Sequence, residues 1–189
     1  MSVVALVLAA GSARRFGADK RQVALADGRS LLTHSVERAR AAFADVRVVL
    51  RAGERGEDLG LPGDCRIVAS PEAAAGMGHS LAAGAGSLLD SRAQAVAILL
   101  GDMPWIEPAT LCRLAEAASA STIVLPRHAG QYGHPVIFGR DFWAALARLS
   151  GDEGARSLVR GQQGCCTVVE VDDAGVLLDV DTPEQVMQA

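Results

Sequence analysis

Glycine and cationic residues gather in one short stretch behind the first apolar run of the chain. The run Val3 to Leu8 is followed by Gly11, Arg15, Gly17 and Lys20. Glycines let the main chain approach a ligand closely, and the neighbouring N–H groups can hold phosphate oxygens. Arginine binds such oxygens bidentately, and lysine adds a movable positive charge. The spacing predicts a loop that binds nucleotide phosphates; the alternative is a surface loop that is merely rich in Gly and Arg.

Two common phosphate-binding sequences are absent from this stretch. Neither GxxxxGK[ST] nor GxGxxG occurs there, which disfavours an ordinary P-loop NTPase and a dinucleotide-binding fold. The second apolar run ends at Arg51, where an NAD-binding fold would carry a carboxylate for the ribose. An NADP-dependent oxidoreductase with Arg51 on the ribose 2′-phosphate remains as an alternative.

Acidic residues follow two later apolar runs. Gly101 and Asp102 come directly after the run Ala95 to Leu100, so the carboxylate is expected at the end of a buried strand. Asp179 and Asp181 alternate along the chain and would share one side of an extended segment. One or two carboxylates, completed by phosphate or water oxygens, suffice for Mg²⁺. Asp102 is therefore a predicted magnesium ligand, with Asp179 or Asp181 as the second; the alternative role for these residues is capping a turn or helix.

A histidine between a glycine and a proline marks a third candidate loop. Gly133, His134 and Pro135 form a poor setting for a packed core histidine and a good one for backbone close to a ligand. This tripeptide is predicted to lie near a second substrate. Farther on, Asp152 is expected to cap a helix over Glu153 to Arg160.

Short apolar runs alternate with longer helix-compatible stretches along the chain, which is typical of βαβ units. The pattern predicts a three-layer, Rossmann-like α/β fold: a mostly parallel sheet with helices on both faces and a mixed sheet edge in the C-terminal third. Such a sheet places the three candidate loops at the carboxyl ends of its strands. The expected strands are Val3–Leu8, Val46–Leu50, Arg66–Ala69, Ala95–Leu100, Thr122–Leu125, Pro135–Phe138, Cys166–Val171 and Val176–Leu178. The expected helices are Ser30–Phe43, Gly78–Leu89, Pro108–Ala118, Asp141–Leu149, Glu153–Arg160 and a short one after Pro183.

Composition narrows the class of partner. The 189 residues carry a formal net charge of −4 with scattered Lys and Arg, which gives no long-range attraction for nucleic acid or an anionic membrane. The first residues lack the basic region of a signal peptide, and four cysteines without a CxxC pair indicate reduced thiols. We therefore expect a cytoplasmic protein that binds small ligands.

The stretch LAAGSARRFGADK resembles the pattern LAAGxSxRxGxxK of the molybdenum cofactor nucleotidyltransferases, a MobA-like family of NTP transferases. The resemblance is strongest to the CTP:molybdopterin cytidylyltransferase branch. It continues in order through GMGHSLAAGA, ILLGDMPWI, GHPVIFGRDF, GDEGAR and DVDTPEQ. One position departs from the pattern, because Ala13 stands where the family has serine and Ser12 precedes it.

This resemblance implies one nucleotidyltransferase domain over residues 1–189, with a nucleotide-binding part of about 1–105 and an acceptor-binding part of about 106–189. The implied reaction transfers CMP from CTP to the terminal phosphate of molybdopterin and releases pyrophosphate; the alternative is another NTP or another phosphorylated acceptor. In the family, Ala-Ala-Gly accompanies cytidylyl transfer, so Ala10 indicates CTP, and we expect its methyl group to shape the pocket against a purine. A molybdoenzyme or chaperone would receive the product.

The resemblance also assigns roles to individual residues. The catalytic group is Arg15, Lys20 and Asp102; the nucleotide contacts are Leu8, Ala9, Ala10, Gly11, Arg15, Lys20 and Gly101. The acceptor contacts are Gly133, His134, Pro135 and Arg156, and the magnesium ligands are Asp102 and Asp181.

Overall fold

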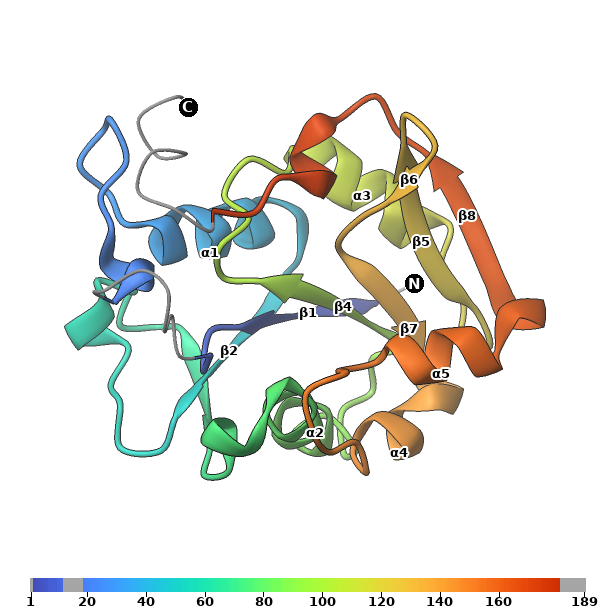
Figure 1. The fold of residues 1–189 in the computed structure, drawn as a ribbon, viewed down its shortest axis with the longest axis horizontal. Coiled ribbons are helices and arrows are strands. Elements are labelled where there is room, and N and C mark those ends of the chain that lie inside the picture. The colour runs from blue at the N-terminus through green and yellow to red at the C-terminus, as the bar shows by residue number, and fades with distance from the viewer. Residues whose placement is uncertain (1, 12–18, 181–189) are drawn as a thin grey trace.

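The computed structural model describes residues 2–11 and 19–180, which form a mixed sheet of eight strands between two layers of helices (Figure 1). The strands are β1 (Val3–Leu8), β2 (Asp45–Arg51), β3 (Arg66–Ser70), β4 (Ala95–Leu100), β5 (Ile123–His128), β6 (Gln131–Tyr132), β7 (Val136–Gly139) and β8 (Cys166–Glu170). The helices are α1 (Leu31–Ala42), α2 (Met77–Gly86), α3 (Pro108–Glu116), α4 (Trp143–Leu146) and α5 (Arg156–Gly161).

The strand order is β3-β2-β1-β4-β7-β5-β6, with β8 also paired to β5. Strands β1 to β4 pair in parallel, and β5 pairs in parallel with β8. Strand β7 runs antiparallel between β4 and β5, and β6 runs antiparallel to β5. The predicted α/β class is confirmed, including the mixed part of the sheet in the C-terminal third.

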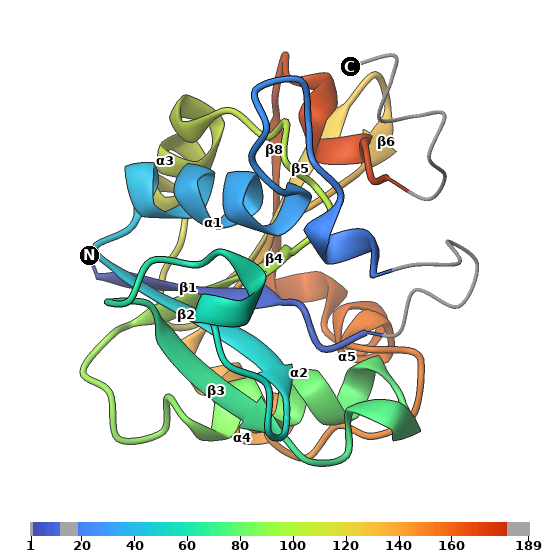
Figure 2. The ribbon, with the colours of Figure 1, turned by 90° about the vertical axis from the view of Figure 1, so that its left-hand side faces the viewer.

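Each face of the sheet has its own apolar core, because successive residues of a buried strand point to opposite faces. Along β1, Val4 and Leu6 contribute to one core and Ala5 and Val7 to the other. Helices α1 and α3 cover the face of Ala5, while α2 and α4 cover the face of Val4, as Figures 1 and 2 show. Because both faces of these strands are buried, their sequences are continuous apolar runs.

One expected strand is wrong. Residues 174–177 form a 3₁₀ turn, so Val176 to Leu178 is not extended. The Asp173 carboxylate accepts the Gly175 N–H at 2.8 Å and closes the turn. A Cβ on Gly175 would lie 2.4 Å from the Trp105 carbonyl oxygen, so the turn packs backbone to backbone on the segment before α3.

Two helices of the C-terminal third are shorter than expected. Helix α5 begins at Arg156, after Gly151 and Gly154 take positive φ angles of 72° and 58° that no helix accommodates. The predicted cap at Asp152 is therefore wrong. The segment expected as one helix from Asp141 divides into a 3₁₀ turn over residues 140–142 and the short α4. Strand β6 was not predicted, because its two residues carry no periodic pattern.

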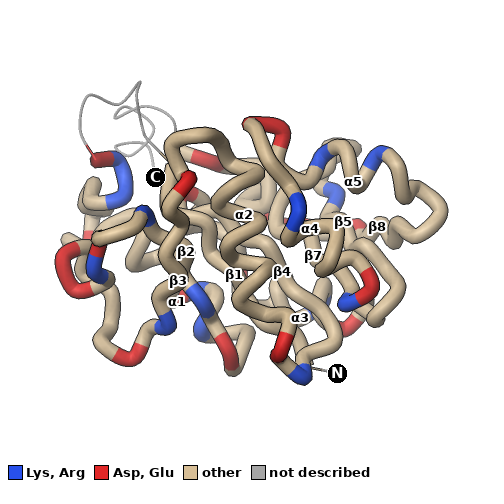
Figure 3. Tube along the Cα trace, turned by 90° about the horizontal axis from the view of Figure 1, so that it is seen from below, with Lys and Arg blue, Asp and Glu red and all other residues tan. Residues whose placement is uncertain are grey.

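Charged residues of both signs are interspersed over the face seen in Figure 3, as the composition led us to expect. Within residues 2–11 and 19–180, no helix is long and apolar enough to cross a membrane.

Candidate active site

The loops after β1 and β4 lie side by side because these strands are parallel neighbours, with Leu8 opposite Leu100. The Gly101 N–H donates to the Leu8 carbonyl at 3.0 Å. A Cβ on Gly101 would lie 3.1 Å from the Ala9 Cβ and 3.2 Å from the Leu8 oxygen. Glycine at this position therefore lets the two loops pack closely.

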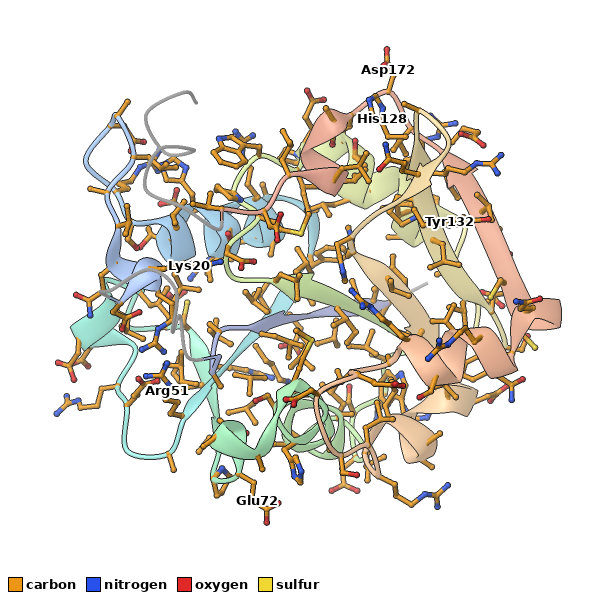
Figure 4. All side chains as sticks on the ribbon, viewed as in Figure 1. Lys20, Arg51, Glu72, His128, Tyr132 and Asp172 are labelled. Carbon is orange, nitrogen blue, oxygen red and sulfur yellow. The ribbon has the colours of Figure 1, made fainter. Side chains whose placement is uncertain are left out.

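Lys20 and Asp102 meet at this end of the sheet. The Lys20 Nζ lies 2.7 Å from the Asp102 Oδ2, and the two side chains are 14% and 28% exposed. Lys20 opens a 3₁₀ turn over residues 20–22, which begins where the Asp19 carboxylate accepts the Arg21 N–H. Figure 4 shows Lys20 beside the ends of the central strands. Two residues predicted from separate motifs thus form one ion pair, shielded from much of the solvent.

The second oxygen of Asp102 is buried and has no hydrogen-bond partner within the described residues. A buried carboxylate oxygen without a donor is costly unless a cation or another group satisfies it. The Val180 N–H donates to the Asp102 carbonyl at 3.1 Å, which brings the chain just before residue 181 to this loop. Asp179 is exposed there. Arg15 and Asp181 lie outside the described residues.

Asp102 therefore fits a divalent cation that also binds phosphate oxygens. Among the described residues no three His, Cys, Asp or Glu side chains converge on one point. Such a site suits a hard cation with few protein ligands, which takes the rest of its oxygens from phosphates and water.

The backbone of Ala9 to Gly11 is held by arginines that the sequence did not single out for this purpose. Arg21 donates to the Ala9 carbonyl, and Arg51 donates to the carbonyls of Ala10 and Gly11. The N–H groups of Ala10 and Gly11 have no partner within the part of the chain that the structure describes. Of these two residues Ala10 is buried and Gly11 is exposed, so the loop offers the Gly11 N–H to a ligand. Sequence reasoning missed Arg21 and Glu54, because nothing in a sequence distinguishes a buried arginine from an exposed one.

Ala10 itself is only 2% exposed and packs in the core on the α2 face of the sheet. Its methyl group is therefore not available to line an open pocket. The direct steric role that we expected for this methyl group is not supported.

The loop Gly133 to Pro135 is held by backbone contacts rather than left open. Gly133 donates to the Pro126 carbonyl at 3.1 Å, and His134 donates to the Val176 carbonyl at 2.8 Å. A Cβ on Gly133 would lie 2.2 Å from that Val176 oxygen. Glycine is required here for packing against residue 176, and the His134–Pro135 bond is cis. The N–H groups of Gly133 and His134 are therefore engaged within the chain rather than open to a ligand.

The side chain of His134 is the polar group that this loop presents. Its Nδ1 is buried and has no hydrogen-bond partner among residues 2–11 and 19–180. Burial lowers the pKa of His134 below its ordinary value, and the nearby charge of Arg156 acts in the same direction; the carboxylate of Asp102 and the backbone of Ile98 beside the ring oppose it. Arg156 is exposed at the start of α5. These effects place His134 within electrostatic reach of both Asp102 and Arg156.

Two glycine-rich segments that lie far apart in the sequence also contact each other. The Gly78 N–H donates to the Gly151 carbonyl at 2.7 Å, and a Cβ on Gly76 would lie 2.4 Å from the same oxygen. The stretches GMGHS and GDEGAR are therefore neighbours in space, and their glycines serve this contact.

Comparisons with known proteins found a matching family model and several similar proteins. Residues 5–166 match the model of the MobA-like NTP transferase domain. The purine catabolism protein PucB of Bacillus subtilis (strain 168) is 31% identical over 97% of this chain and 93% of its own length. The nicotine blue oxidoreductase of Paenarthrobacter nicotinovorans is 27% identical, covering 97% and 94%. The molybdenum cofactor cytidylyltransferase of Escherichia coli (strain K12) is 25% identical, covering 97% and 93%.

A similar structure has been solved for Rv0371c from Mycobacterium tuberculosis H37Rv. It is 30% identical, with a TM-score of 0.83 over 100% of this chain and 97% of that one. A structure of Rv0371c in complex with manganese aligns with a TM-score of 0.80 at 28% identity over 100% of this chain and 97% of that one. The whole described fold therefore has counterparts among solved structures.

Proposed function

We propose that this chain, which belongs to the MobA-like NTP transferase family, transfers CMP from CTP to the terminal phosphate of molybdopterin and releases pyrophosphate. The family makes the chain a nucleotidyltransferase. The observation that carries the proposal is the Lys20–Asp102 pair at the carboxyl ends of β1 and β4, with one Asp102 oxygen left unpaired. The cytidylyltransferase name of the Escherichia coli relative supports the choice of CTP and molybdopterin.

The reaction needs little from a general base. A phosphate monoester has its second pKa near 6. The acceptor phosphate is therefore largely dianionic at neutral pH and already nucleophilic. The site has to bring this oxygen in line with the α-phosphorus of the nucleotide and to compensate the charge that moves onto the leaving pyrophosphate.

Cationic side chains supply that compensation. We assign Lys20 to the charge near the α-phosphate and Arg15 to the departing pyrophosphate. A substrate phosphate that enters beside Lys20 competes with Asp102 for the same ammonium group. Asp102 would then be released to hold a divalent cation, with Asp181 as its second ligand. When bound, Mg²⁺ supplies positive charge to the phosphates of both substrates, and the manganese complex of Rv0371c supports a divalent ion in this fold.

The base of the nucleotide is assigned to the backbone of Ala9 to Gly11, next to Leu8 and Gly101. The N–H of the exposed Gly11 suits an acceptor on a ring edge, such as N3 or O2 of cytosine.

The acceptor is assigned to the second half of the chain. The charges of Asp102 and Arg156 both act on the pKa of His134, so the three side chains lie in one region of the molecule. A guanidinium group at the start of α5 suits the phosphate of a pterin substrate. Gly133 and Pro135 would support His134 rather than contact the acceptor. In this proposal residues of about 1–105 bind the nucleotide and residues of about 106–189 bind the acceptor, in the cytoplasm, and a molybdoenzyme or its chaperone takes the product.

An NADP-dependent oxidoreductase is the second candidate, and the name of one relative favours it. In that reading Arg51 would bind the ribose 2′-phosphate. Arg51 instead donates to the carbonyls of Ala10 and Gly11 and contacts Glu54, so its guanidinium is already engaged inside the loop. This engagement argues for the transferase.

The test is pyrophosphate release from CTP, GTP and ATP, each with molybdopterin or a simple phosphate acceptor, with and without Mg²⁺ or Mn²⁺. We expect release with CTP and molybdopterin that stops when the metal is chelated. A preference for CTP over GTP of about 10-fold or more is expected, the range that a single pocket contact gives. Equal turnover with GTP would remove the assignment of CTP, and hydride transfer with NADPH without any pyrophosphate release would favour the oxidoreductase.

A further inference from the structure

Three consecutive carbonyl oxygens at the end of β1 accept hydrogen bonds from two arginine side chains. The Arg21 Nη1 donates to Ala9 at 2.9 Å. The Arg51 Nε donates to Ala10 at 3.1 Å, and its Nη2 donates to Gly11 at 2.6 Å. A single guanidinium group thus spans two successive peptide groups, which fixes their orientation more firmly than one hydrogen bond does.

Glu54 connects the two arginines. Its Oε1 and Oε2 accept from the Nη2 and Nη1 of Arg21 at 2.6 and 2.8 Å. The same carboxylate accepts the Arg51 backbone N–H at 3.0 Å and lies 3.4 Å from the Arg51 Nη1. Figure 4 shows Arg51 at the end of β2, below the loop that it holds. One carboxylate therefore orders both donors of the three carbonyls.

Arg21, at the centre of the network, is well shielded, and each nitrogen of its guanidinium donates to a partner. The Arg21 side chain is 8% exposed, and Asp19 accepts from its Nε at 2.8 Å and from its Nη2 at 2.6 Å. The Arg21 guanidinium holds the pKa of the Asp19 and Glu54 carboxyls below their usual values. Both carboxylates are therefore charged at neutral pH. A buried guanidinium with two such partners is a rigid support, because removing either partner leaves charge uncompensated.

The network satisfies the acceptors of the loop and leaves the N–H of the exposed Gly11 for a ligand. The carbonyls of Ala9, Ala10 and Gly11 are all engaged, whereas the N–H groups of Ala10 and Gly11 find no acceptor among the described residues. Peptide groups held in this way cannot turn their carbonyls toward the nucleotide. Preorganised donors of this kind contribute to binding because little ordering remains to be done when the ligand arrives.

We propose that Glu54 is a positioning residue for the nucleotide, which acts by bracing Arg21 and Arg51 against the carbonyls of Ala9 to Gly11. This inference rests on the proposed function, in that a nucleotide enters beside this loop. Glu54 itself touches no substrate in this arrangement. Its loss should therefore weaken nucleotide binding more than it slows the chemical step.

The first experiment compares Glu54→Gln with Glu57→Gln. Glu57 pairs with Arg55 at 2.7 Å, and both side chains are largely exposed in the same loop, so it controls for a lost carboxylate. CTP binding is measured by calorimetry with Mg²⁺ and without acceptor, and KM and kcat are measured separately. We expect the Kd and KM of Glu54→Gln to rise about 10-fold, the loss of one charge-assisted hydrogen bond, with kcat within about 3-fold. Glu57→Gln should match the wild type.

A second variant keeps the proposal testable if Glu54→Gln folds poorly. Arg51→Lys retains the positive charge but cannot reach two carbonyls at once, so its KM should also rise about 10-fold. The double variant should show a KM close to that of either single variant, because both changes release the same support. Independent, multiplying effects would overturn the proposed connection.

The outcomes separate this inference from the function on which it rests. A wild-type protein that binds none of CTP, GTP and ATP overturns the proposed function and this inference with it. Wild-type binding together with an unchanged Kd in Glu54→Gln overturns the inference alone. A fall in kcat that follows a loss of folded protein, with KM unchanged, would mean a purely structural role and would also overturn it.

Discussion

Two loops of this molecule were expected to offer backbone to a ligand, and the surroundings of their backbone differ in the structure. After β1, nothing described lies within 4 Å of a Cβ built on Gly11, and two successive N–H groups have no described acceptor. Before β7, Gly133 packs directly on residue 176, and both N–H groups of Gly133 and His134 are engaged. A glycine in a loop therefore indicates that another group packs closely on the backbone, but the sequence does not say whether this group is a ligand or the protein itself. In the first loop no described residue fills the space beside the glycine, and in the second the backbone of residue 176 fills it.

The unpaired polar atoms carry the same contrast. The first region leaves the Asp102 Oδ1 without a partner among the described residues, and the second leaves only the His134 Nδ1. The β1–β4 edge therefore presents an unpaired carboxylate oxygen, and the second loop presents an unpaired ring nitrogen.

The largest effect should come from the Lys20–Asp102 pair. We expect Lys20→Ala and Asp102→Ala each to lower the rate of pyrophosphate release by ~10²–10³, the loss of one preorganised charged group. The melting temperature should stay close to that of the wild type. Asp64→Ala breaks an exposed ion pair with Arg40 of the same 2.7 Å length and serves as the control. Near-normal turnover in either active-site variant would contradict a catalytic role for the pair, and with it the proposed difference between the two regions.

The two glycines give a matched test of intermediate size. A methyl group on Gly133 would lie 2.2 Å from the Val176 oxygen, so the backbone has to move. We expect Gly133→Ala to lose about 1–3 kcal/mol, with a melting temperature lower by ~2–4 °C per kcal/mol. Gly11→Ala should keep its melting temperature and instead raise the KM for CTP, because no described residue lies within 4 Å of the new methyl group and an incoming nucleotide would meet it. A Gly133→Ala variant with wild-type stability, measured by thermal unfolding, would contradict the packing role.

The smallest effect concerns pH. Burial lowers the pKa of His134 in the folded protein, while the unfolded chain keeps the ordinary value near 6.5. As the pH falls below about 6.5, the unfolded chain binds a proton that the folded protein does not, so stability decreases. The slope from this one group is at most ~1.4 kcal/mol per pH unit.

The measurement is the difference in melting temperature between pH 7.5 and 5.5, taken in the presence of a chelator. His134→Asn should lose less stability over this interval than the wild type. The Asp19 and Glu54 carboxyls contribute above their unfolded values of 3.8 and 4.5, so their loss belongs to more acidic solutions. Identical slopes in variant and wild type would show that His134 is not the buried neutral group of the second region.

Much of the architecture could be predicted from the sequence because local pattern and burial agree there. Apolar runs such as Ala95 to Leu100 are long enough to be buried on both faces, and Pro108 begins α3 where expected. The failures are short elements. Residues 176–178 and the start of α5 are decided by turns around Asp173, Gly151 and Gly154. Asp173 also accepts the distant Glu107 N–H, and Gly151 accepts the distant Gly78 N–H.

The site divides along the same line. The sequence by itself determined the fold class and the residue types at the strand ends, because periodicity and the chemistry of Gly, Lys and Asp are local properties. Only the tertiary structure decided that Lys20 contacts Asp102, that Arg21, Arg51 and Glu54 hold the loop of Ala9 to Gly11, and that Gly133 is closed by Val176. These contacts join residues far apart in the chain. Whether a charged or glycine residue is satisfied or left open depends on which distant backbone lies beside it, and local sequence does not contain that neighbour.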